Sequence, residues 1–127
     1  MQKGLIRVGV YDIDTILKLL KSGRKKHTFI TRHGNIDVKL TSQRYLSFLI
    51  NGIKCVHCGK ECSYMALERF YDQDIYHLNA YAKSDSGKEV LMTKDHIVPK
   101  SRGGRNCINN YQTMCVNCNT KKADKLR

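Results

Sequence analysis

The sequence has no long apolar run, which argues against a protein that crosses a membrane by a helix. No stretch of its 127 residues approaches the roughly 20 consecutive apolar residues that a membrane-spanning helix needs. The first fifteen residues, MQKGLIRVGVYDIDT, lack the long apolar core of a signal peptide. We therefore expect a soluble, intracellular protein without a membrane partner.

Acidic residues are also scarce. The chain has 11 aspartates and glutamates and 23 lysines and arginines, which gives a formal net charge of +12. An excess of this size favours a polyanionic partner, with nucleic acid as the leading candidate and an anionic membrane surface as the lesser one. The alternative is a basic surface that serves only to keep the protein soluble.

Proline occurs once, at Pro99, and the chain has no internal repeat and no low-complexity tract. A chain of this length is enough for one domain, or for one small domain with an accessory segment, and it should bury roughly two thirds of its unfolded surface. We place the boundary between residues 52 and 53, where the composition changes, so that 53–127 form the main domain.

Residues 1–52 show no recognisable chemistry but predict an accessory α/β segment. A strand is expected over 5–10 and a hairpin over 28–40, with a helix after each. The residues expected to cap and end the two helices are Asp12 or Asp14 with Gly23, and Thr41 or Ser42 with Gly52. The segment is either a small packing unit or a DNA-positioning arm that uses the basic residues Lys21, Arg24, Lys25 and Lys26.

Residues 53–127 alternate in hydrophobicity in a way that predicts strands over 63–71, 75–82 and 88–95, with a short extended piece over 111–114. A short helix should follow within 115–125. Strands gathered before a helix, rather than alternating with helices, indicate an α+β fold.

Two CxxC pairs stand at the ends of this region, Cys55 with Cys58 and Cys115 with Cys118. The spacing lets two thiolates of one turn bind one metal ion, and two such turns complete a tetrahedral Cys₄ zinc site with no open position. We therefore predict a structural Zn²⁺. A redox CxxC is the ordinary alternative, and a rival ligand set could use Cys62 or His57.

The chain from Cys55 to Lys125 closely resembles the HNH endonuclease family, whose site is a ββα-metal finger. The features that carry this resemblance are the first CxxC pair, Asp95-His96-Ile97-Val98-Pro99, Gly103-Gly104, Asn110, and Cys115-xx-Cys118-Asn119 with Lys122 after it. The combination is specific, whereas Asp-His or Gly-Gly alone would be weak.

The resemblance implies a role for each matching residue. His96 falls on the general base, and Asn110 falls on the residue that holds the loop and the base in place. Asp95 and Asn119 fall on ligands of the catalytic metal. The products implied are a 3′-hydroxyl and a 5′-phosphate, with one strand cut per site.

The chemistry of these side chains agrees with that assignment. A histidine with an ordinary pKa near 6.5 can take a proton from water at neutral pH. The oxygen atoms of Asp95 and Asn119 suit a hard divalent cation such as Mg²⁺ or Mn²⁺, which keeps several waters. Taken singly, Asn110 would be a turn residue and Asn119 a helix cap.

Basic residues flank the proposed site and are expected to contact DNA phosphates. They are Lys100, Arg102, Arg105, Lys121, Lys122, Lys125 and Arg127. Lys122 lies three residues after Asn119 on the predicted helix, so we expect it to be the best single phosphate contact. The alternative is a solvated charge run.

We therefore expect a metal-dependent endonuclease that acts on double-stranded DNA as a monomer or homodimer. Two alternatives stay open. A non-catalytic zinc-ribbon adaptor for nucleic acid would need the cysteines and the charge but not Asp95, His96 and Asn119. A secreted, disulfide-stapled basic protein would have oxidised cysteines. The other four histidines are expected to be structural or solvated, and Gly103-Gly104 to permit a loop bend.

Overall fold

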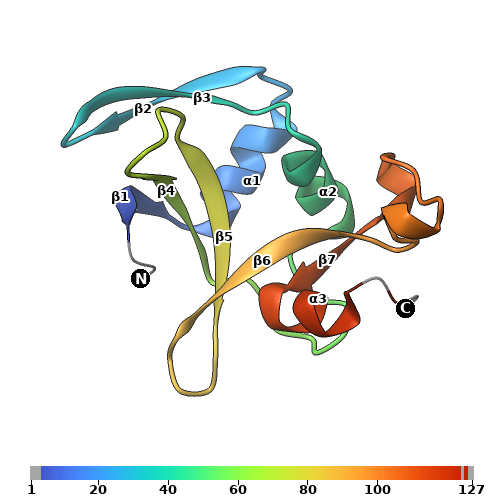
Figure 1. The fold of residues 1–127 in the computed structure, drawn as a ribbon. Coiled ribbons are helices and arrows are strands. Elements are labelled where there is room, and N and C mark those ends of the chain that lie inside the picture. Colours follow the sequence, from blue (N-terminus) through green and yellow to red (C-terminus); the bar gives the residue numbers. More distant parts are fainter. Residues whose placement is uncertain (1–3, 124, 126–127) are drawn as a thin grey trace.

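A five-stranded antiparallel sheet in the order β1-β4-β5-β6-β7 forms the centre of the fold (Figure 1). The computed structural model describes residues 4–123 and 125. The strands of the sheet are β1 (Leu5–Tyr11), β4 (Tyr64–Phe70), β5 (His77–Lys83), β6 (Glu89–His96) and β7 (Tyr111–Cys115). A separate hairpin consists of β2 (Lys26–Thr31) and β3 (Gly34–Lys39).

The described residues also form three α-helices, which are α1 (Ile13–Lys21), α2 (Gln43–Asn51) and α3 (Val116–Lys122). This mixture of helices and antiparallel sheets confirms the expected α+β class. The longest of these helices have nine residues, so none of them has the length to cross a bilayer.

The ends of the first two helices follow the predicted capping residues. Asp12 Oδ1 accepts a hydrogen bond from the Thr15 amide at 2.7 Å, and Ser42 Oγ accepts one from the Tyr45 amide at 3.2 Å. Gly52 follows α2 with φ of 81°, a left-handed conformation that favours glycine. These caps fix where both helices begin, as the sequence predicted.

The core lies between the sheet and the first two helices. Met65 and Leu67 of β4 and Leu78 of β5 are fully buried, as are Ile16 of α1 and Phe48 of α2. All five belong to one hydrophobic cluster that includes residues from both sides of position 52. The first segment therefore packs on the second, and the division between them stays a prediction.

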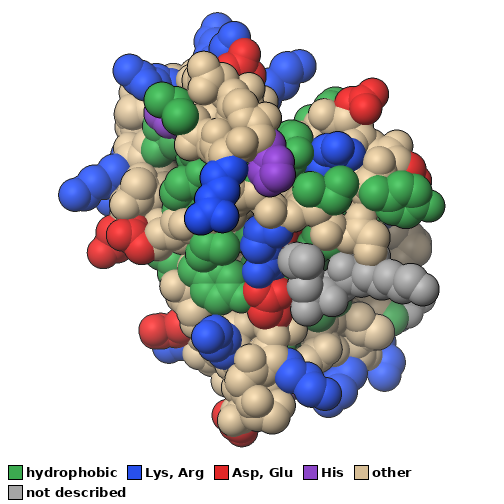
Figure 2. All heavy atoms as spheres, turned by 90° about the vertical axis from the view of Figure 1, so that its left-hand side faces the viewer, with side chains coloured by type: hydrophobic (Ala, Val, Ile, Leu, Met, Phe, Trp, Pro, Cys, Tyr) green, Lys and Arg blue, Asp and Glu red, His purple; other side chains and the backbone are tan. Residues whose placement is uncertain are grey.

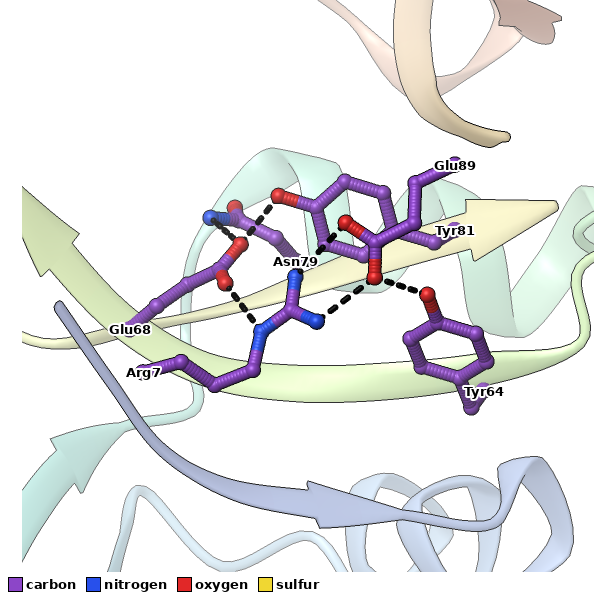
Figure 3. Close-up of polar contacts among 6 residues, drawn as sticks. All are labelled: Arg7, Tyr64, Glu68, Asn79, Tyr81 and Glu89. Atoms are coloured by element: carbon purple, nitrogen blue, oxygen red, sulfur yellow. Dashed lines mark hydrogen bonds and ion pairs between the residues drawn. The ribbon is translucent and has the colours of Figure 1, made fainter. Parts of the chain in front are cut away.

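Strand β1 comes from the first segment but pairs with β4, in the same sheet as the strands that follow. Its Arg7 side chain reaches across two strands (Figure 3). Arg7 Nε donates to Glu68 Oε2 of β4 at 2.8 Å, and Nη1 donates to Glu89 Oε1 of β6 at 2.6 Å. One guanidinium thus ties β1 to two strands of the main domain.

Two tyrosine hydroxyls complete this network, with Tyr81 donating to Glu68 and Tyr64 donating to Glu89 (Figure 3). The hydrogen bond from Arg7 is the main reason that the pKa of Glu89 lies below its ordinary value. Burial, followed by the bond to Glu89, raises the pKa of Tyr64 to about 12. Glu68 itself has no exposed surface, so its charge depends on these partners.

We predict that Arg7→Met lowers the free energy of unfolding at pH 7 by about 3 kcal/mol, because Glu68 stays buried without its cation. Chemical denaturation measures this change, with the exposed turn residue Arg32→Met as the control. Adding Glu68→Gln to Arg7→Met removes the uncompensated charge and should recover part of the loss.

The same network predicts acid sensitivity. Since the folded pKa of Glu89 is lowered, its stabilising contribution is present above its ordinary pKa and lost as pH falls through the folded value. If the wild-type chain were no more stable than Arg7→Met at pH 7, the stabilising role of the Arg7 network would be contradicted.

Candidate active site and metal centre

Four cysteine sulfurs meet between the start of the main domain and α3. The Sγ atoms of Cys55, Cys58, Cys115 and Cys118 all lie within 4.8 Å of one another. The loop that holds the first pair is docked on β7 by a 3.0 Å hydrogen bond from the Val56 amide to the carbonyl of Thr113. Of the described residues, these four are the ones that assemble into such a cluster, and the rival ligands Cys62 and His57 are not among them.

The surroundings of these sulfurs fit a bound cation. Burial raises the pKa of the Cys55 thiol, but backbone amides led by that of Cys58 outweigh burial and lower it to about 6. Burial and the other cluster sulfurs raise the pKa of Cys118 to about 12. Four thiolates therefore cannot gather here without positive charge between them. The cluster could hold a metal such as zinc, which four-sulfur sites bind with no open position.

Three of the four predicted catalytic residues, Asp95, His96 and Asn119, line one cleft of about 360 Å³ at the end of β6, whereas Asn110 is not part of its lining. Asp95 and His96 are the last two residues of that strand, and Asn119 enters from α3. The remaining residues that line the cleft are Lys94, Pro99, Lys100, Ser101, Lys122 and Ala123. Residues more than twenty positions apart in sequence thus share one site.

Asp95 is held by two side chains that the sequence did not indicate. Its carboxylate is 6 % exposed, and Oδ2 accepts a hydrogen bond from Gln112 Nε2 at 2.8 Å. Gln112 stands directly opposite Asp95 in the β6–β7 register. Lys122 Nζ lies 3.2 Å from the same oxygen. Within the described part of the chain, the other oxygen, Oδ1, carries no hydrogen bond, so it is left for a ligand.

Asn119 is oriented in the same manner. Its Nδ2 donates to Thr93 Oγ1 at 2.9 Å, and that hydroxyl donates to the carbonyl of Met114 at 2.8 Å. Because the hydroxyl proton of Thr93 is already used, Thr93 can only accept from Asn119. The amide nitrogen is thereby fixed against β6, and its oxygen is the end that remains for a cation.

One ring nitrogen of His96 is engaged, and the other forms no hydrogen bond with any described residue. Nε2 lies 2.8 Å from Oδ1 of Asn106, an acceptor, which assigns the proton to Nε2 and leaves Nδ1 basic. The edge of the ring meets the Tyr111 ring at a centroid distance of 5.2 Å. Nothing in the sequence singled out Asn106, which is one of several polar residues in a loop.

Asn110 pins the loop that follows His96. Its Oδ1 accepts from the Val98 amide at 2.9 Å, and its Nδ2 donates to the carbonyls of Val98 at 3.1 Å and Arg105 at 2.9 Å. The loop also closes tightly at Gly104, where an added Cβ would lie 1.7 Å from the Val98 carbonyl oxygen. The expected loop bend is therefore present, and it requires glycine at 104.

The position of Lys122 differs from the expectation that its side chain points outward and contacts a phosphate. Its residue is 8 % exposed, and Nζ donates to the carbonyl of His96 at 2.8 Å while it pairs with Asp95. A helical position facing the sheet buries the ammonium next to the carboxylate of Asp95, which compensates its charge. This arrangement corrects the expected role of Lys122 to an internal one.

The other basic residues expected to contact DNA lie at the surface. They are Lys100, Arg102, Arg105, Lys121 and Lys125. Lys100 lines the cleft itself, whereas Lys121 and Lys125 line a separate hollow near the cysteine cluster. Arg127 lies outside the described residues.

We predict that Cys58→Ser lowers the metal content of the purified protein from about one equivalent per chain, because a three-sulfur site binds zinc less tightly. The matched control is Cys107→Ser, which removes an exposed cysteine outside the cluster and should leave the metal content unchanged. Elemental analysis of protein purified without added metal measures both. Equal metal in the two variants would contradict the four-sulfur assignment.

A second prediction separates the internal role of Lys122 from a phosphate contact. Lys122→Met should lower the free energy of unfolding by about 3 kcal/mol, since it leaves Asp95 buried without its cation. Its neighbour Lys121 is exposed, so Lys121→Met should change stability by less than about 0.5 kcal/mol. A Lys122→Met variant as stable as Lys121→Met would show that the buried pair has no stabilising role.

Comparison with known proteins agrees with this site. Residues 81–127, a little over a third of the chain, match the family model described as HNH endonuclease. No curated protein and no solved structure gave a match. The matched segment contains β6, β7 and α3 with the cleft residues and the second cysteine pair, while Cys55 and Cys58 precede it. The resemblance to the HNH endonuclease family is thus confirmed for the segment 81–127.

Proposed function

We propose that the protein is a metal-dependent HNH endonuclease that hydrolyses phosphodiester bonds in double-stranded DNA. The observation that carries the proposal is the convergence of Asp95, His96 and Asn119 in one cleft, each held by a defined hydrogen-bond partner. We interpret β6, β7 and α3, with the loop between the strands, as the ββα-metal finger of the family.

The cleft fits a hard divalent cation, which we propose to be Mg²⁺ or Mn²⁺. Asp95 Oδ1 and the Asn119 amide oxygen would hold it, because both are oxygen ligands whose other polar atom is already bonded to the protein. When bound, such an ion would polarise the phosphate and relieve charge on the leaving 3′ oxygen.

In the proposed reaction His96 accepts a proton from the attacking water through Nδ1. The hydrogen bond from Nε2 to Asn106 keeps the ring in the tautomer that makes Nδ1 basic. Asn110 holds the loop that bears Val98 and Arg105, and so keeps the wall of the cleft next to the base. The products are a 3′-hydroxyl and a 5′-phosphate, and each site cuts one strand.

We further propose that the cysteine cluster binds Zn²⁺ with a structural role. Cys118 directly precedes Asn119 on α3, so the ion would fix the position of a ligand of the catalytic metal. Lys100, Arg102, Arg105, Lys121 and Lys125 are the proposed phosphate contacts of the cleft and its surroundings.

The main alternative is a zinc-ribbon adaptor that binds nucleic acid without cutting it. It accounts for the cluster and the charge, but it gives no reason for the oriented oxygens of Asp95 and Asn119. The secreted, disulfide-stapled alternative is disfavoured by the geometry, because all six cysteines are free and four of them share one cluster.

We predict that His96→Ala lowers the rate of nicking of supercoiled plasmid in Mg²⁺ or Mn²⁺ by at least about 100-fold, the usual contribution of a general base. His33→Ala removes an exposed turn histidine and serves as the matched control, with no change expected. Gel electrophoresis of the nicked and linear forms measures both rates.

Two results would contradict the proposed endonuclease activity. Equal conversion by wild type and His96→Ala would show that the cleft is not the catalytic centre. Tight DNA binding with no conversion under either metal would favour the adaptor instead.

A further inference from the structure

A second hollow lies next to the cleft and is lined in part by the first segment of the chain. It is a groove of about 510 Å³ between the beginning of α2, the beginning of β5 and the later part of β6. Its lining residues from the first segment and β5 are Ser42, Gln43, Arg44 and His77, and those from β6 are Leu91, Met92, Thr93 and Lys94. Lys94 lines the cleft as well, so the two hollows are neighbours on either side of that residue.

The lining of this groove carries positive charge and no described acidic residue. Arg44 and Lys94 come from elements far apart in sequence, and His77 lies beside them. The pKa of His77 is lowered, first by burial and then by the charge of Arg44. Like charges placed together without a carboxylate are stabilised by an anion that lies between them.

Both cations are held in place without being neutralised. Lys94 Nζ lies 4.2 Å from the centre of the Tyr111 ring, and the guanidinium carbon of Arg44 lies 5.3 Å from that of Tyr45. Arg44 Nη2 also donates to the carbonyl of Leu78 at 3.0 Å. Within the described residues neither side chain forms an ion pair with a carboxylate. Ordered cations of this kind contact phosphate at a small cost in side-chain entropy.

Two other parts of the surface are different. On the face shown in Figure 2, acidic side chains are interspersed among the lysines and arginines. At the far tip of the β5–β6 hairpin, the exposed Lys83 and Lys88 stand beside Asp85 and Glu89 in the sequence. The groove therefore combines three features: a hollow shape, cations without a carboxylate partner among the described residues, and a lining residue, Lys94, that it shares with the cleft.

We propose that this groove binds the sugar–phosphate backbone of the DNA strand that continues away from the cleaved phosphate, with Arg44 and Lys94 as its phosphate contacts. The inference rests on the proposed endonuclease function and specifies the path of its substrate. It gives α2, which lies outside the segment matched by the family model, a part in substrate binding. Phosphate contacts of this kind fix the register of a duplex without reading its bases.

The test uses a labelled DNA duplex, fluorescence anisotropy and zinc-loaded full-length protein in a His96→Ala background without added Mg²⁺ or Mn²⁺. Arg44→Gln with Lys94→Gln should raise the Kd at least tenfold and reduce the salt dependence of log Kd by about 2, about 1 for each lost phosphate contact. Lys83→Gln with Lys88→Gln removes the same charge elsewhere and is the matched control.

A second variant excludes the explanation that DNA binding is lost because the protein misfolds. Gln43 is the exposed first residue of α2, where a negative charge stabilises a helix. Gln43→Glu should therefore leave the free energy of unfolding unchanged or higher and still weaken DNA binding. Lys83→Gln changes the net charge by the same amount and should have the smaller effect on the Kd.

The outcomes distinguish the groove from the endonuclease. If the groove variants and their controls weaken binding equally, only the total charge matters and the groove is overturned. The same holds if wild type does not bind the duplex. If the groove variants alone lose affinity while wild type fails to nick plasmid in Mg²⁺ or Mn²⁺, the groove stands as a binding surface and the proposed endonuclease does not.

Discussion

The crowding of four sulfur atoms is the constraint on which the rest of the main domain depends. Their Sγ atoms lie within 4.8 Å of one another, so as four thiolates they would repel unless a cation lay between them. The cluster joins the loop before β4 to the junction of β7 and α3. Cys115 directly precedes α3 and Cys118 lies within it, so the cluster links the start of this helix to the first cysteine loop. In a domain of this size, an ion bound by the cluster would contribute a large share of the folding free energy.

The geometry of the cleft then follows from a shell of neutral and cationic partners. Gln112 and Lys122 hold one oxygen of Asp95, and Thr93 holds the nitrogen of Asn119. Both residues line the same cleft, and each partner holds one end of a side chain whose other end forms no hydrogen bond among the described residues. Preorganisation of this kind means that a ligand does not have to rearrange the site when it binds.

Much of the local structure could be predicted from the sequence because local signals determine it. Asp12 and Ser42 were among the residues that predicted the starts of two helices, and the alternation of apolar residues predicted β4, β5 and β6. The CxxC pairs and the Asp-His pair carry enough chemistry to be recognised together. These features depend on neighbours within a few positions.

What the sequence did not predict depends on partners distant in the chain. The pairing of β1 with β4 and the reach of Arg7 to Glu89 become visible only when the strand order is known. The sequence suggested that Lys122 lies at the surface, because it is the packing of α3 on β6 that brings this lysine close to Asp95. The groove could not be predicted for the same reason, because Arg44 and Lys94 come to line one groove only through the contact of α2 with β6.

The attachment of β1 also has a consequence for synthesis on the ribosome. Arg7 emerges early, but the carboxylates that compensate it are Glu68 and Glu89, which are translated much later. The contact between Arg7 and Glu89 cannot form until β6 has left the exit tunnel, and Asn119 emerges later still. A nascent chain therefore holds its basic first segment before the residues of the candidate cleft, Asp95, His96 and Asn119, are all present.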